Sequence, residues 1–178
     1  MADAARETVA AKAARIDAGR ANEGCCSAVG AQRMTTIAWD GITLAADRAA
    51  WSGGCKYRVR KVFNVTATTG KRYLVAFCGD GHFAQAVLSW MRGGQHPGAY
   101  PTTDHVVVAV VIDEQRRIWR LESTALRYGR VLERLHACGG GQDFAIGALE
   151  GGANAVQAVR IAIKRSEMAG LGVDSVKF

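Results

Sequence analysis

The sequence contains very little proline and no long hydrophobic segment. Only two of its 178 residues are proline, which argues against long disordered stretches. The longest apolar run, VVVAVVI at residues 106–112, is far too short to cross a bilayer. Residues 1–33 include no apolar block of the length that a secretory signal needs. We therefore expect a cytoplasmic protein that has no membrane partner.

Recognisable metal-binding and redox motifs are absent as well. The cysteines do not have the spacing of metal ligands or of a redox pair, so we expect free thiols in a reducing cytoplasm at Cys25, Cys26, Cys55, Cys78 and Cys138. The histidines at positions 82, 96, 105 and 136 likewise lack metal-ligand spacing. The stretch GGGQDFAIG is not a dinucleotide fingerprint, because Phe144 occupies the place of the third glycine. We expect no metal and no cofactor.

The net charge of +7 raises the question of a nucleic-acid partner. The densest basic patch is CKYRVRK at residues 55–61, with Lys71 and Arg72 nearby, and the other basic residues are dispersed. The sequence has no long basic tract and no recognisable DNA- or RNA-binding motif. It therefore predicts no nucleic-acid binding.

Residues 1–33 differ in composition from the rest of the chain. They are rich in Ala, Arg and Gly and contain no Leu, Phe, Trp or Tyr. An alanine-rich helix over residues 2–18 would offer little apolar surface for docking. From Met34 onward the pattern changes to strands. We interpret residues 1–34 as a leader, a propeptide or a mis-assigned N-terminal extension, and residues 35–178 as one domain.

The apolar pattern of residues 35–178 predicts an α+β domain. TTIAW and ITLAAD flank Asp40-Gly41, the strongest short signal for a β-hairpin. Asp80 is positioned to cap a helix that runs to about Arg92. Two further helices are expected after the glycines at 139–141, and further strands at residues 57–65, 73–78, 105–112, 118–121, 133–138 and 172–178. This order favours two stacked antiparallel sheets with helices outside them.

A lysine lies on the apolar face of the strand predicted at residues 57–65. The apolar positions in phase with Lys61 are Tyr57, Val59, Phe63 and Val65. Such a lysine either pairs with a carboxylate or lies at an edge, where its stem packs and its head reaches water. Asp47, at the end of ITLAAD, is a candidate partner, although an Asp after a strand more commonly serves as a turn or cap residue. Spacing alone leaves these alternatives open.

Thr35 follows Met34 at the start of the first predicted strand. As an internal residue it would be an ordinary strand threonine. As an N-terminal residue it would have a free amine with a pKa of roughly 7.7–8, which can take the proton from its own hydroxyl. A nearby Lys61 ammonium would lower the pKa of that amine, and Asp47 would keep the lysine charged. Together the three residues predict a nucleophile with its base built in.

Six stretches together suggest a family: MTTIAWDGITLAADR, RKVFNV, YLVAFCGDG, CGGGQDFAIGALEGG followed by AVRIAIKRSEMAG, and the closing GVDSVKF. With them the chain resembles proteasome β-type subunits, in the bacterial and phage-borne branch that includes the HslV peptidases. The resemblance implies a four-layer αββα sandwich of the N-terminal-nucleophile hydrolase class. It also implies a threonine endopeptidase that assembles as a homo-oligomeric ring and degrades unfolded proteins or peptides. An AAA+ ATPase unfoldase is a candidate partner.

The resemblance also implies a role for each site residue. Thr35 is the nucleophile, Asp47 and Lys61 are its acidic and basic partners, and the backbone amide of Gly79 in FCGDG stabilises the oxyanion. Relatives that cleave themselves usually carry Gly before the threonine, whereas Met34 precedes it here. Translation from Met34, followed by removal of that methionine, would expose Thr35.

The chain departs from the family pattern at the positions that usually support the N-terminal amine. Gly140 stands where a helper serine is usual, and Ser166 and Ala169 stand where Asp and then Ser or Thr are usual. The alternative to a peptidase is therefore a non-catalytic, ring-forming scaffold subunit of the same fold. A third interpretation is an amidase of small molecules, because a fold does not determine its substrate.

Overall fold

The computed structural model describes residues 34–96, 107–122 and 127–178. The helix expected over residues 2–18 and the two cysteines at positions 25 and 26 lie outside this part. Of the described cysteines, Cys55 is exposed, whereas Cys78 and Cys138 are buried. Within the described residues, no helix has the length and apolar character required to cross a membrane.

One antiparallel sheet is built around the predicted hairpin. Its four strands, in the order β10-β1-β2-β11, are His136–Gly139, Thr36–Trp39, Thr43–Asp47 and Val173–Lys177. The turn between β1 and β2 forms as expected, because Gly41 adopts a φ of 93° that glycine tolerates. The Asp40 carboxylate accepts hydrogen bonds from the backbone N–H groups of Ile42 and Thr43. The hairpin prediction is confirmed.

The second sheet has five antiparallel strands that follow one another in chain order. They are β5 (Val62–Thr66), β6 (Arg72–Cys78), β7 (Val108–Asp113), β8 (Ile118–Glu122) and β9 (Arg127–Val131). The main core lies between the two sheets. Alternate residues of the first sheet, such as Ile37 and Leu44, face this core, whereas their neighbours Ala38 and Ala45 face the opposite side.

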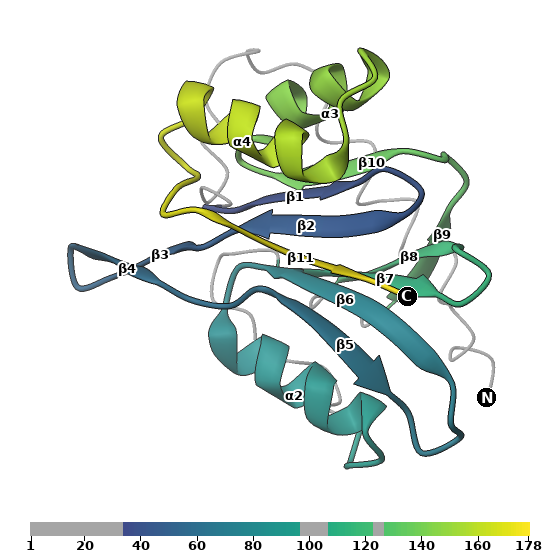
Figure 1. The fold of residues 1–178 in the computed structure, drawn as a ribbon. Helices are drawn as coiled ribbons and strands as arrows, with labels where there is room; N and C mark the ends of the chain where they lie inside the picture. The colour runs from purple at the N-terminus through teal and green to yellow at the C-terminus, as the bar shows by residue number, and fades with distance from the viewer. Residues whose placement is uncertain (1–33, 97–106, 123–126) are drawn as a thin grey trace, which may run out of the picture.

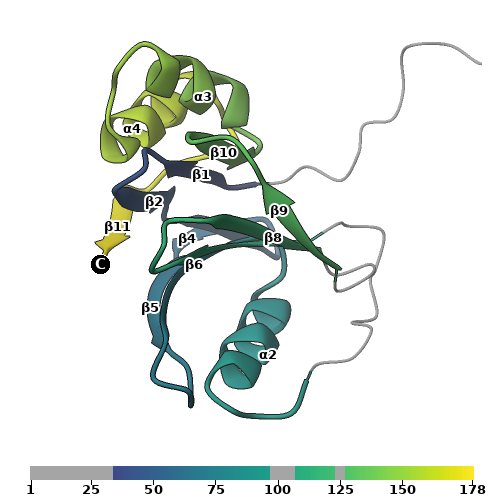
Figure 2. The ribbon, with the colours of Figure 1, turned by 90° about the vertical axis from the view of Figure 1, so that its right-hand side faces the viewer.

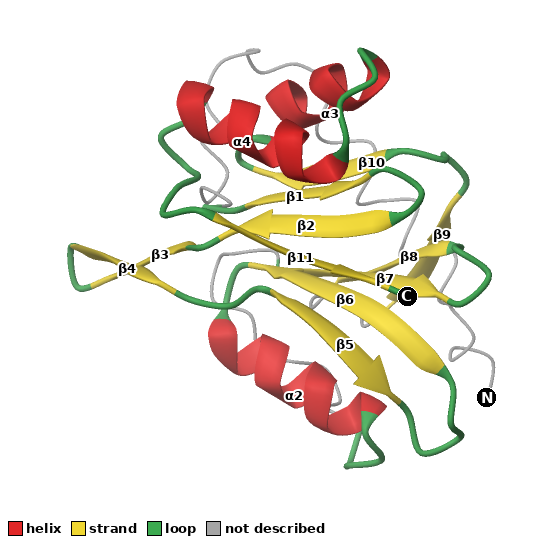
Figure 3. Cartoon of the chain, viewed as in Figure 1, coloured by secondary structure: helices red, strands yellow, loops and turns green. Residues whose placement is uncertain are grey.

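Helices cover the outer faces of both sheets (Figures 1 and 2). Helices α3 (Gln142–Glu150) and α4 (Ala155–Arg165) pack on the first sheet, and α2 (Gly81–Met91) packs on the second. Asp80 caps α2 as predicted, since its side chain accepts hydrogen bonds from the N–H groups of His82 and Phe83. The expectation of an α+β protein with antiparallel sheets and outer helices is confirmed (Figure 3).

The prediction of a single strand over residues 57–65 is wrong. The chain instead forms a two-stranded hairpin, β3 (Ala49–Ser52) and β4 (Cys55–Arg58), which projects from the body of the molecule (Figure 1). Gly53 and Gly54 form its turn with positive φ angles of 56° and 78°. Residues 59–61 then lead into the second sheet outside any strand. The apolar residues at 57, 59, 63 and 65 keep the same phase on both sides of this break, so the period alone did not reveal where the strand ends. The sequence also failed to indicate β9.

His136 gives the stability of the fold a dependence on pH. Its Nε2 is buried and finds no hydrogen-bond partner among the described residues. Burial lowers the pKa of His136, Arg120 lowers it further, and Glu133 opposes them. In the unfolded chain the His136 imidazole binds a proton below about pH 6.5. In the folded state the same imidazole binds its proton only at a lower pH. Between about pH 6.5 and the lower pKa of the folded state, the unfolded state therefore binds more protons than the folded state. The free energy of unfolding decreases as the pH falls through this window.

We expect the His136→Gln variant to lose less stability than the wild type between about pH 7 and pH 5.5, because glutamine binds no proton in either state. Urea unfolding at the two pH values measures the difference. His82→Gln is the matched control, since His82 is exposed. Equal pH slopes for wild type and His136→Gln would contradict the prediction.

Candidate active site

Thr35 lies immediately before β1 and is 2% exposed. Its hydroxyl donates a hydrogen bond to the carbonyl oxygen of Met34 and accepts one from Lys61 Nζ at 2.8 Å. Lys61 Nζ also lies 3.4 Å from the same Met34 carbonyl oxygen. The carbonyl of residue 34 is thus held by both the hydroxyl and the ammonium. A chain that began at Thr35 would lack it and leave both donors available.

Lys61 pairs with Asp47 across the two sheets. Asp47 is the last residue of β2, whereas Lys61 directly precedes β5 instead of lying in the middle of a strand. Lys61 Nζ is 3.0 Å from Asp47 Oδ1, and the two side chains are 8% and 0% exposed. Of the alternatives left open by spacing, the structure has the buried ion pair and not the edge lysine. Its catalytic role stays a prediction.

The Asp47 carboxylate accepts four hydrogen bonds and fixes the geometry of the site. Oδ1 accepts from Lys61 Nζ and from the N–H of Thr36 at 2.9 Å. Oδ2 accepts from the N–H groups of Ala49 and Gly170, both at 3.0 Å. One carboxylate therefore connects β1, β3, the segment before β11 and the lysine. Both oxygens are used, so a neutral side chain cannot replace it without loss.

Two opposing effects determine the charge of Lys61. Burial lowers the pKa of Lys61, and the Asp47 carboxylate raises it; the neighbouring Cys78 also raises it and Lys56 lowers it. The burial effect is the largest, so the pKa lies below the ordinary value for lysine. The Lys61 ammonium, buried 2.8 Å from Thr35 Oγ1, can stabilise negative charge that develops on that oxygen. It would also disfavour protonation of an amine on Thr35.

Gly79 follows β6 at the same end of the molecule as Thr35. It has a φ of 110°, and an added Cβ would approach Val107 Cγ1 to 2.8 Å, so the position requires glycine. Gly139 links this region to the nucleophile. A Cβ added at Gly139 would lie 2.0 Å from the Thr35 carbonyl oxygen and 3.4 Å from Cys78 Sγ. Thr35, the end of β6 and the end of β10 therefore converge, while a role for the Gly79 amide stays a prediction.

The positions that depart from the family pattern lie beside this site. Ser166 Oγ donates to the carbonyl oxygen of Gly140 at 3.4 Å and accepts from the N–H of Met168. Ala169 is 3% exposed and offers no hydroxyl. The sequence did not identify the supporting amides of Ala49 and Gly170 as part of the site, because a backbone N–H leaves no mark on residue type. The triple glycine at 139–141 was the available signal for the close approach of β10. Among the described residues, no group of three or more His, Cys, Asp or Glu side chains comes together as a metal site.

Comparisons with known proteins give a fold but no sequence family. No family model matches the chain, and no curated protein matches its sequence. Among solved structures, Anbu from Hyphomicrobium sp. strain MC1 has a TM-score of 0.58 at 9% identity over 81% of each chain. Anbu from Yersinia bercovieri, described as an ancestral beta-subunit, has a TM-score of 0.54 at 10% identity over 81% of each chain. The Anbu complex from Pseudomonas aeruginosa, described as a helical assembly, has a TM-score of 0.57 at 10% identity, covering 81% of this chain and 80% of that one.

The expected place within the HslV branch is wrong, since these neighbours are Anbu proteins and not HslV peptidases. The chain has a proteasome-like fold, and identities this low establish no more than that. The stretches behind the HslV assignment form β1, β2, β5, β6, α3, α4 and β11, which belong to both sheets and to the helices on the first sheet.

Proposed function

We propose that this chain is an N-terminal-nucleophile threonine peptidase, with Thr35 as the nucleophile. The observation that carries the proposal is the buried contact of Thr35 Oγ1 with Lys61, which is paired with Asp47. A lysine and an aspartate buried together are costly to maintain for stability alone. The order helices, sheet, sheet, helix supports assignment to the αββα sandwich of N-terminal-nucleophile hydrolases.

In the proposed reaction, the amine of Thr35 acts as the base. It takes the hydroxyl proton while Thr35 Oγ1 bonds to the carbonyl carbon of the substrate, which gives a tetrahedral oxyanion. The Gly79 amide donates to that oxyanion. The protonated amine then passes its proton to the leaving nitrogen as the peptide C–N bond breaks, leaving an ester on Thr35. Water, deprotonated by the same amine, hydrolyses the ester and restores the hydroxyl.

Lys61 contributes charge to this reaction. Its ammonium keeps the Thr35 amine unprotonated at neutral pH and stabilises the developing alkoxide at Oγ1. Asp47 keeps the ammonium charged against the effect of burial and holds it in place. The substrates are unfolded proteins or peptides that reach the site in extended form.

The proposal requires that Thr35 be the first residue of the active chain. We expect intact-mass measurement and N-terminal sequencing of the active protein to show a chain of residues 35–178, with residues 1–34 absent. Hydrolysis of a fluorogenic peptide by that chain then tests the function itself, and a chain that retains Met34 serves as the control without a free Thr35 amine. Full activity in a protein that begins at Met1 would overturn the assignment of the amine as base.

The proposed peptidase works as a homo-oligomeric ring in the cytoplasm, because enclosure keeps an unspecific nucleophile away from folded proteins. The Pseudomonas aeruginosa Anbu complex, of similar fold, was solved as a helical assembly. An AAA+ ATPase would supply unfolded substrate. Sedimentation of the active chain should show a closed particle of many subunits, and an active monomer would contradict this part of the proposal.

A non-catalytic scaffold of the same fold is the second candidate. Gly140 and Ala169 favour it, since neither carries the hydroxyl that would support the amine of Thr35. Peptide hydrolysis separates the two. A chain that begins at Thr35 and assembles, yet cleaves no peptide, would be a scaffold.

A further inference from the structure

We propose that Lys56 is a positioning residue of the candidate active site, which clamps the peptide unit between Ala169 and Gly170 onto Asp47. The inference rests on the proposed function and extends it to a residue outside the Thr35 site. Lys56 belongs to the basic patch at residues 55–61, in which Lys61 is the other residue placed in the site.

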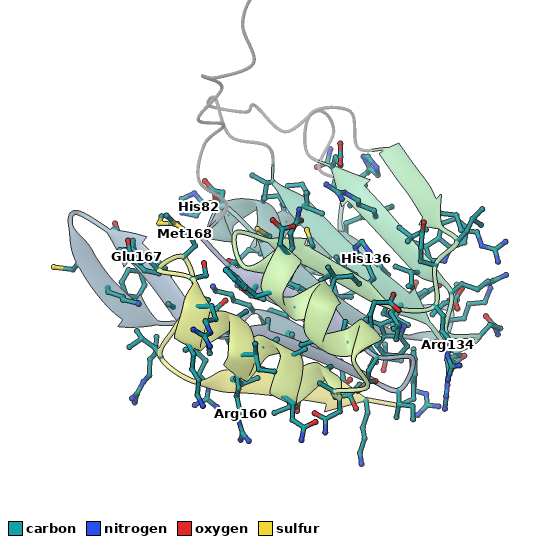
Figure 4. The ribbon with its side chains drawn as sticks, turned by 90° about the horizontal axis from the view of Figure 1, so that it is seen from above. His82, Arg134, His136, Arg160, Glu167 and Met168 are labelled. Carbon is teal, nitrogen blue, oxygen red and sulfur yellow. The ribbon has the colours of Figure 1, made fainter. Side chains whose placement is uncertain are left out.

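Lys56 contacts both its own hairpin and the loop that connects α4 to β11. Its Nζ lies 4.6 Å from the centroid of the Trp51 ring, its partner across the β3–β4 hairpin, in a cation–π contact. The same Nζ donates to the Ala169 carbonyl oxygen at 3.5 Å. Figure 4 shows that loop, marked by Glu167 and Met168, beside the projecting hairpin. The ammonium thus bridges the hairpin and the loop.

Gly170 leaves the space that Lys56 occupies. A Cβ added at this position would lie 2.6 Å from Lys56 Nζ and 3.0 Å from Cε. A hydrogen bond of 3.5 Å is weak by itself, so the close packing on Gly170 and the contact with Trp51 are what locate the ammonium. Lys56 is therefore held against the loop even though it lies on an exposed strand.

One peptide unit joins Lys56 to the active site. Its carbonyl oxygen, that of Ala169, faces the Lys56 ammonium, and its N–H, that of Gly170, donates to Asp47 Oδ2 at 3.0 Å. A cation at the oxygen and an anion at the N–H both align with the dipole of the amide. A cation at the carbonyl also polarises the amide and strengthens the N–H as a donor. Lys56 therefore favours the orientation of this peptide that supports Asp47.

This clamp acts where the chain lacks the usual polar side chain. Ala169 stands at the position that would carry a hydroxyl, so the side chain of residue 169 cannot anchor the loop through a hydrogen bond. Lys56 anchors the same residue through its backbone carbonyl. The positive charge of Lys56 also lowers the pKa of Lys61, and the Asp47 carboxylate, held in place by the same peptide unit, opposes that effect.

The test compares Lys56→Met with Arg58→Met in a chain that begins at Thr35. Methionine retains most of the apolar stem and removes the charge, while Arg58 is an exposed cation two residues further along β4. We expect Lys56→Met to lower kcat by about 10- to 100-fold, as a misplaced catalytic group does, with KM little changed. The acid limb of its pH–rate profile should move to higher pH, because a looser Asp47–Lys61 pair depresses the pKa of the Thr35 amine less. Lys56→Arg should recover part of the rate, and Arg58→Met should resemble the wild type.

Hydrogen exchange at the Gly170 amide tests the clamp without requiring turnover. We expect faster exchange in Lys56→Met, with amides of β7 unchanged as an internal reference. Unchanged exchange at Gly170 would overturn the inference, even if the rate fell. Faster exchange in a protein whose wild type cleaves no peptide would support the clamp and reject the proposed peptidase, so the two failures are distinguishable.

Discussion

Replacing Thr35 with alanine should reduce peptide hydrolysis by about 10⁴-fold or more, as expected for loss of a covalent nucleophile. The variant removes the oxygen that lies 2.8 Å from Lys61 Nζ, and no pH restores it. The fold should survive, because the substitution removes one hydroxyl just before β1 and costs on the order of 1 kcal/mol. Initial rates across a pH series, with assembly checked by sedimentation, measure both effects.

Two control variants show whether the loss of activity in Thr35→Ala is due to the missing nucleophile. Thr35→Ser keeps a hydroxyl and an amine and should retain measurable activity. Thr66→Ala makes the same chemical change at the exposed end of β5 and should leave the rate unaltered. Activity of Thr35→Ala equal to that of the wild type would show that another residue is the nucleophile.

Replacing Asp47 with asparagine should lower the free energy of unfolding by about 3–5 kcal/mol and abolish turnover. Each carboxylate oxygen accepts two hydrogen bonds, from Thr36 and Lys61 on one side and from Ala49 and Gly170 on the other. An asparagine presents one oxygen and one NH₂ group, so in either orientation two buried donors face a third donor. The similar shape of the two side chains does not protect the variant.

Urea unfolding of Asp47→Asn, beside the control Asp174→Asn, measures that cost. Asp174 lies in β11 next to the residue that pairs with Asp47 and forms an ion pair with Arg48 nearer the surface. Its loss should cost less than about 1 kcal/mol, as is typical of such pairs. A stability loss at Asp47 no larger than at Asp174 would show that the four hydrogen bonds contribute little.

Local features of the fold were readable from the sequence where one short segment determines them. Asp40-Gly41 specifies a tight turn through its backbone conformation, and Asp80 caps α2 with its own side chain. Strand boundaries were less accessible. Apolar residues recur with a period of two at positions 57, 59, 63 and 65, yet the chain leaves β4 at Arg58 and enters β5 at Val62. Alternation reports which side chains share a face, and it does not report which strand lies alongside to receive the backbone hydrogen bonds.

The sequence by itself determined the chemistry that the site can contain: a threonine before the first strand, an aspartate at the end of the second, and a lysine before an apolar pair. Only the tertiary structure decided that Lys61 forms a buried ion pair and that Gly170 and Ala49 hold Asp47 through their amides. It also decided that Lys56, from an exposed strand, reaches the carbonyl of Ala169. The reason is physical: side-chain type is written in the sequence, whereas backbone donors are the same at every residue except proline and acquire a role only when folding brings them to a partner.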